Sequence, residues 1–160
     1  MAERRTHDYQ CHGTTSLFAA LDIASGSVIG KCWPRHRALE FRKFLKHIDR
    51  AVPADLAVNL VLDNYAKEIR QWFLRHPRYT LHFTPTHSSW LNQVERWFAL
   101  LSQRQINRGS HFSVRELETA IADFIAVHNE QPKPFAADAI LSSIGRFASR
   151  TLVEHGATNM

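Results

Sequence analysis

The order of apolar patterns along the chain predicts one α/β domain with a helical C-terminal end. Three observations support this fold class. A length of 160 residues suits one domain, a chain that is 44% hydrophobic and 22% charged can bury a core, and runs with strand and helix periodicity alternate. Residues 1–14 are polar and are expected to form an arm, and the domain is placed at residues 15–160.

Each predicted element depends on a local pattern. Alternating or short apolar runs predict strands, apolar residues at helical spacing predict helices, and Pro and Gly mark the ends. The run LAVNLVL is almost continuously apolar, as expected for a strand covered on both faces. In order, we predict strands at 15–21 and 28–33, a helix at 35–52, a strand at 56–62, a helix at 67–75, a strand at 79–83, and helices at 90–108, from Ser113 to Pro132, and at 137–153.

The charge balance indicates a polyanionic partner. The net charge is +5 and the isoelectric point is about 9.6, which favours nucleic acid. Cys11 and Cys32 provide no disulfide framework, so a reducing cytosol is expected. The first ten residues lack the apolar stretch of a signal peptide, and no apolar run is long enough for a transmembrane helix. A membrane is therefore not an expected partner.

Asp63 directly follows the predicted strand 56–62. Ligands of open α/β sheets gather beyond the carboxyl ends of strands, so a carboxylate here is a candidate metal or substrate ligand. The alternative is that Asp63 and Asn64 only form an Asx-turn after the strand. Position alone leaves both interpretations open.

Glu95 lies on the predicted helix 90–108, beside its apolar stripe. A carboxylate at that border needs a partner or a metal ion, and the alternative is an ion pair with a nearby arginine. Considered together, a strand-end Asp63 and a helical Glu95 could meet at a site for Mg²⁺, which prefers oxygen ligands. The stripe consists of Trp90, Leu91, Val94, Trp97, Phe98 and Leu101.

Several longer motifs resemble the transposases of a bacterial insertion-sequence family related to the Tc/mariner elements, which belong to the DDE superfamily of endonucleases. The resemblance covers nearly the whole chain. The motifs, in order, are FAALDIASG (18–26) with WPRHR (33–37), LVLDNY (60–65), HFTPTHSSWLNQVERWF (82–98), RGSHFSVRELE (108–118) and HNEQPKPF (128–135).

This resemblance implies an RNase H-like (integrase-like) mixed sheet flanked by helices, and a catalytic triad of two Asp and one further acid. By motif, Asp63 matches the second Asp and Glu95 the third acid. The first Asp belongs to a strand upstream of the first hairpin, so we expect an N-terminally truncated domain lacking that strand. Asp22 and Asp8 do not match the triad position. The segments after LVLDNY and after HNEQPKPF are also shorter than the family pattern.

The function implied by the resemblance is DNA transposition, in which Mg²⁺ or Mn²⁺ held by Asp63 and Glu95 supports cleavage and joining of DNA phosphodiesters. The expected location is the bacterial cytoplasm, on the nucleoid. A homodimer is a possible oligomeric state. Because the first Asp is missing, we expect this chain alone not to cleave DNA. Element ends and target DNA would be its partners, and the candidate phosphate contacts are Lys43, Lys46, Arg50, Arg104 and Arg108.

Two alternative functions stay open. The chain could be a non-catalytic remnant that keeps a basic DNA-binding or self-associating surface, or an RNase H-like nuclease that acts on RNA or repair intermediates. A zinc site at His7, Cys11 and His12 is disfavoured, because no second ligand pair has suitable spacing. Two structural expectations follow from the truncated domain. Asp63 and Glu95 should share one cleft, and the strand at 15–21 should have an open edge.

Overall fold

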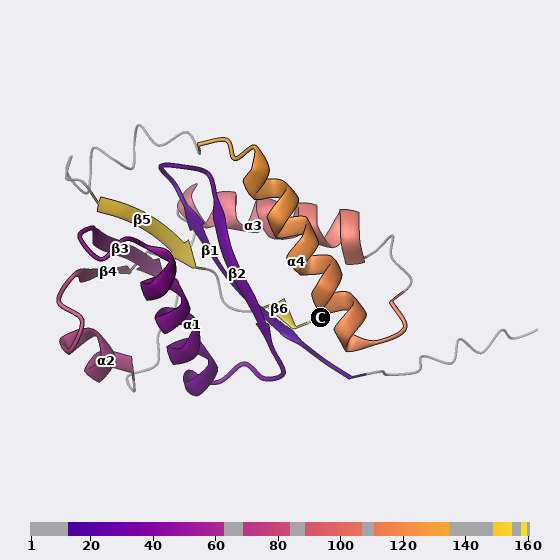
Figure 1. Ribbon diagram of the computed structural model, residues 1–160, viewed down its shortest axis with the longest axis horizontal. Helices are drawn as coiled ribbons and strands as arrows, with labels where there is room; N and C mark the ends of the chain where they lie inside the picture. The colour runs from indigo at the N-terminus through magenta and orange to yellow at the C-terminus, as the bar shows by residue number, and fades with distance from the viewer. Residues whose placement is uncertain are drawn as a thin grey trace, which may run out of the picture.

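The computed structural model describes residues 13–62, 69–83, 89–106, 111–134, 149–154 and 158–159. These residues form one mixed sheet with helices on both faces (Figure 1). The strands are β1 (Ser16–Asp22), β2 (Val28–Trp33), β3 (Ala57–Leu62), β4 (Tyr79–Phe83), β5 (Ser149–Glu154) and β6 (Thr158–Asn159). The helices are α1 (Ala38–Ala51), α2 (Arg70–Leu74), α3 (Ser89–Leu101), its π-helical continuation η2 (Ser102–Ile106) and α4 (Val114–Glu130).

The sheet has the order β2-β1-β5-β3-β4, and β6 also pairs with β1. β1 runs antiparallel to both β2 and β5, whereas β3 runs parallel to both β4 and β5. β1 is buried along its whole length, and its side chains alternate between the two faces of the sheet. Leu17 and Leu21 join the core beneath α3 and α4, while Phe18 and Ala20 join the core beneath α1 and α2.

The predicted open edge of the first strand is wrong. β1 pairs with β2 on one side and with β5 and β6 on the other. β5, from the C-terminal part of the chain, therefore lies between β1 and β3. The resemblance had implied that the strand beside β1 is lacking. Residues 149–153, which the sequence predicts as the end of a terminal helix, form strand β5 instead, and the rest of that predicted helix, residues 137–148, lies outside the described residues. Strand pairing on both sides overrides the local helical pattern of this segment.

The other predicted elements agree with the described residues. β2 and β4 have the predicted bounds, and β1, α1 and β3 differ from the prediction by a few residues at their ends. The predicted capping of the helix after Ser113 is present, because the Ser113 hydroxyl accepts a 3.2 Å hydrogen bond from the Glu116 backbone. The expected helix at 90–108 continues from α3 into η2, and residues 107–110 lie outside the described residues.

Helix α4 is held against the β1–β2 hairpin by paired hydrogen bonds. The Asn129 side chain accepts from the Val28 amide and donates to the Val28 carbonyl, both at 2.8 Å. The side-chain amide of Asn129 therefore pairs with the Val28 N–H and C=O groups as the backbone of an adjacent strand would. Gly26 in the turn has a φ of +77° and lies so close to the Lys133 carbonyl that a Cβ atom would collide with it.

Arg78 joins the end of α1 to the start of β4. Its guanidinium donates to the Asp49 carboxylate and to the backbone carbonyls of Asp49 and Pro53, and Tyr79 donates to the same carboxylate at 3.1 Å. Burial acts to raise the pKa of Asp49, but the hydrogen bonds from Arg78 and Tyr79 outweigh it, so this pKa lies below its ordinary value. None of the helices within the described part of the chain is long and apolar enough to cross a membrane.

Candidate functional site

The carboxyl ends of three parallel strands lie side by side at one edge of the sheet. Leu62, the last residue of β3, is in register with Phe83 of β4 and with Glu154 of β5. Asp63 follows Leu62 in the sequence, but residues 63–68 lie outside the described residues. The structure thus establishes the strand that leads to Asp63. The predicted cleft shared by Asp63 and Glu95 involves residues beyond those described and stays a prediction.

Glu95 is exposed on α3, immediately after the buried Val94. The buried stripe of this helix contains Trp97, Phe98 and Leu101, which pack against the sheet. Within the described ranges Glu95 forms no ion pair with an arginine, which was the alternative interpretation for this residue. Its carboxylate is therefore accessible from solvent.

Asp22 holds the turn between β1 and β2. It is 1% exposed and lies at the end of β1. Its carboxylate accepts hydrogen bonds from the Ala24 backbone at 3.2 Å and from the Ser25 hydroxyl at 2.7 Å. These bonds close the turn between β1 and β2, in the manner of an Asx-turn.

Glu154 is an acidic residue that the sequence pattern did not single out. It ends β5 and stands in register with Leu62 on one side and Ala20 on the other. The residue thus lies at the same sheet edge as the start of the segment that contains Asp63. The signal that could have found it is the apolar run Leu152–Val153 before a carboxylate, which repeats the pattern at the end of β3.

The predicted phosphate contacts do not form one surface. Lys43, Lys46 and Arg50 are exposed on α1, whereas Arg104 is exposed on η2, which continues the helix on the opposite face of the sheet. Arg108 lies outside the described residues. A single straight DNA segment therefore cannot contact all of the described members of this set along one face.

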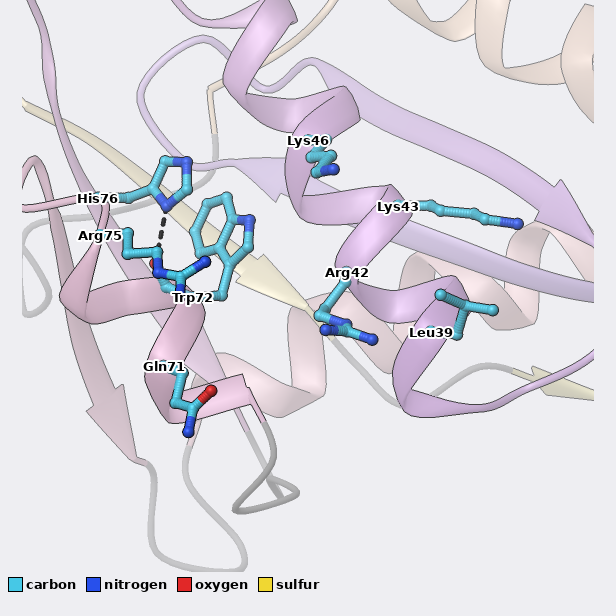
Figure 2. A pocket seen from close by; sticks show the side chains of 8 residues that line it. All are labelled: Leu39, Arg42, Lys43, Lys46, Gln71, Trp72, Arg75 and His76. Carbon is cyan, nitrogen blue, oxygen red and sulfur yellow. Dashed lines mark hydrogen bonds between the residues drawn. The ribbon is translucent and has the colours of Figure 1, made fainter.

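The face that carries α1 and α2 holds a pocket of about 450 Å³ between these two helices (Figure 2). The sequence predicted both helices but not the pocket, because only their packing brings the lining residues together. Arg42 and Lys46 project from α1, and Arg75 projects from α2, while Trp72 stacks on His76 with ring centroids 3.7 Å apart. The lining residues are Leu39, Arg42, Lys43, Lys46, Gln71, Trp72, Arg75 and His76.

Two residues of the motif HNEQPKPF, His128 and Asn129, are of types that often act in catalysis, but here they hold the structure together. His128 contacts the Gly26 carbonyl through Nε2 at 2.9 Å, and Asn129 holds Val28 as described above.

Burial raises the pKa of the Cys32 thiol to about 11, with a further contribution from the negative charge of Glu118. Within the described residues, no three His, Cys, Asp or Glu side chains form a group that could hold a metal ion. His7, Cys11 and His12 lie outside those residues.

Asp63 follows β3 in the sequence and Glu95 is exposed on α3, and carboxylates are the side chains that hold Mg²⁺ beside phosphates in phosphoryl-transfer enzymes. Comparison with protein families gives the particular class. Residues 2–118 match the family described as DDE superfamily endonuclease, so the chain belongs to this family of transposase-type nucleases. No curated protein and no solved structure matches the chain.

Proposed function

We propose that this chain carries out part of DNA transposition in the manner of a metal-dependent insertion-sequence transposase, with Asp63 and Glu95 as the ligands of Mg²⁺ or Mn²⁺. The observation that carries the proposal is the family match, because residues 2–118 include both carboxylates. The placement of Asp63 directly after the buried strand β3 supports it. The strand order β2-β1-β5-β3-β4 supports an RNase H-like sheet.

The residues suit a hard cation. Glu95 is exposed and has no ion-pair partner among the described residues, and Asp63 follows a strand end, where ligands gather in open α/β sheets. A bound divalent ion would supply an activated water and stabilise the leaving oxygen of a phosphodiester. In this proposal the two side chains hold and orient the ion, and the basic surface holds the DNA.

We expect this chain alone not to nick DNA. A site with two ions needs a carboxylate that bridges them, and the resemblance assigns only Asp63 and Glu95 to the triad. Asp22 is a poor substitute, because its carboxylate is engaged in the β1–β2 turn. Glu154 is the better candidate for a third acid, because it stands in register with Leu62.

Metal binding tests the proposal directly. Mn²⁺ titration of the wild-type chain, followed by electron paramagnetic resonance, should detect a site that Asp63→Asn or Glu95→Gln weakens at least about tenfold, since each variant removes a charged ligand. Asp123→Asn is the matched control, because Asp123 is exposed on α4. Equal Mn²⁺ affinity in all four proteins would disprove the assignment of Asp63 and Glu95.

DNA cleavage separates the full proposal from its alternative. Element-end DNA is incubated with the chain and Mg²⁺ or Mn²⁺, beside a form that is extended upstream. Nicking by the extended form alone would support a transposase whose site needs an upstream acid. Nicking by this chain, abolished by Glu154→Gln, would instead assign the third acid to β5. A chain that binds no Mn²⁺ and does not recognise element ends would be a non-catalytic remnant. The basic pocket between α1 and α2 could still give such a remnant nonspecific affinity for DNA.

A further inference from the structure

The pocket between α1 and α2 has the chemistry of an anion site. Four of its lining residues carry a positive charge, namely Arg42, Lys43, Lys46 and Arg75, and none carries a negative charge. The pocket lies over the face of the sheet that is covered by Phe44 and Trp72. It is therefore on the opposite face from α3, which carries Glu95.

The two acidic residues of α1, Glu40 and Asp49, are already engaged. Glu40 pairs with Arg37 at 2.8 Å, and Asp49 pairs with Arg78 at 2.6 Å. Both acids belong to α1, but each is bound by an arginine that does not line the pocket. Arg42, Lys46 and Arg75 consequently make no ion pair within the described part of the chain. All three line the same pocket, and none of the residues around it in the described part of the chain is acidic (Figure 2).

Trp72 adds a second, independent feature. The side chain is 8% exposed, and its Nε1 atom is buried with no hydrogen-bond partner among the described residues. In Figure 2 this nitrogen is directed from α2 toward α1. Buried donors in native proteins are nearly always paired, so an unpaired one beside a cationic pocket points to an acceptor from a ligand.

We propose that the α1–α2 pocket binds the phosphate backbone of DNA. The choice of DNA over other polyanions rests on the proposed function, and the pocket chemistry itself requires only phosphate. Guanidinium groups of Arg42 and Arg75 can each bind a phosphate through two parallel hydrogen bonds, Lys46 adds a point charge, and the Trp72 indole donates one hydrogen bond.

The experiment measures binding of a fluorescein-labelled DNA duplex by anisotropy in EDTA, at several salt concentrations, so that metal binding plays no part. The test variant is R42Q/R75Q. The matched control is R115Q/K133Q, which removes the same charge from exposed positions on and just after α4. The control should weaken binding less than about threefold, whereas R42Q/R75Q should lower affinity at least about tenfold and reduce the salt slope by about 2.

Trp72→Phe is a further variant, because it keeps an aromatic ring beside His76 and removes the indole N–H donor together with part of the ring system. It should weaken DNA binding about tenfold, the effect of a lost hydrogen bond to a charged group, while leaving the salt slope unchanged. Circular dichroism and thermal unfolding of each variant show that the fold is kept.

Equal losses in R42Q/R75Q and R115Q/K133Q would overturn the proposal, because binding would then follow net charge alone. A wild-type chain that binds no DNA would also overturn it. Neither result affects the Mn²⁺ titration of Asp63 and Glu95, so failure of the pocket and failure of the carboxylate site are separate findings. Retained DNA affinity in EDTA together with lost Mn²⁺ binding would instead support the pocket and contradict the metal site.

Discussion

At the scale of single residues, the chemistry of a side chain does not reveal its role without its contacts. His128 and Asn129 open the motif HNEQPKPF, and both are residue types that serve as ligands or catalysts in enzymes. In this protein they contact the Gly26 carbonyl and the Val28 backbone. Asp22 likewise resembles a catalytic carboxylate at a strand end, yet its oxygens accept bonds within the adjacent turn. Hydrogen-bond partners therefore distinguish these groups from Glu95.

Replacing Asn129 tests this structural role. Asn129→Ala leaves the Val28 amide and carbonyl without their partner, and we expect the free energy of unfolding to fall by about 1–3 kcal/mol. Asn129→Asp keeps the acceptor and loses the donor, so it should also destabilise the protein, since a carboxylate then faces the Val28 carbonyl. Urea denaturation followed by circular dichroism measures both. Unchanged unfolding in Asn129→Ala, combined with reduced Mn²⁺ affinity, would assign the residue a functional role.

At the scale of elements, helices and strands with clear hydrophobic periodicity could be predicted from the sequence. Strands that form only by pairing with segments far along the chain could not. β2, β4 and the capped helix α4 follow directly from alternation, Pro and Ser113. β5 could not be predicted, because its position depends on pairing with β1 and β3 from far along the chain. The pocket was missed for the same reason. Arg42 and Arg75 belong to different helices, and only the packing of α2 beside α1 brings them together.

Removing β5 and β6 tests how the sheet is closed. A variant that ends at residue 148 loses the strands that pair with one side of β1 and with β3. The freed N–H and C=O groups of β1 invite pairing with another chain. We expect faster amide exchange at residues 16–22 and self-association in light scattering, relative to the full chain. A monomeric variant with unchanged exchange in β1 would show that this segment does not close the sheet.

At the scale of the whole molecule, β1 links two hydrophobic cores. Phe18 and Ala20 contribute to the core beneath α1 and α2, whereas Leu17 and Leu21 contribute to the core beneath α3 and α4. A strand that is buried on both faces cannot lose one core without exposing apolar surface of the other. The two helical layers should therefore unfold together, as small single domains usually do. This coupling also fixes the position of β3, which ends at Leu62, relative to α3, the helix that carries Glu95.

Cavity-forming substitutions on opposite faces test the coupling. Phe44→Ala beneath α1 should lower the free energy of unfolding by about 3–5 kcal/mol, and Leu101→Ala beneath α3 by about 2–5 kcal/mol, because both side chains are fully buried. Leu74→Ala is the control, since Leu74 is 83% exposed and should change stability little. Hydrogen exchange should accelerate in α1 and α4 by the same factor in either core variant. Acceleration confined to the substituted face would show that the two cores unfold independently, and that the helix carrying Glu95 can separate from the sheet that leads to Asp63.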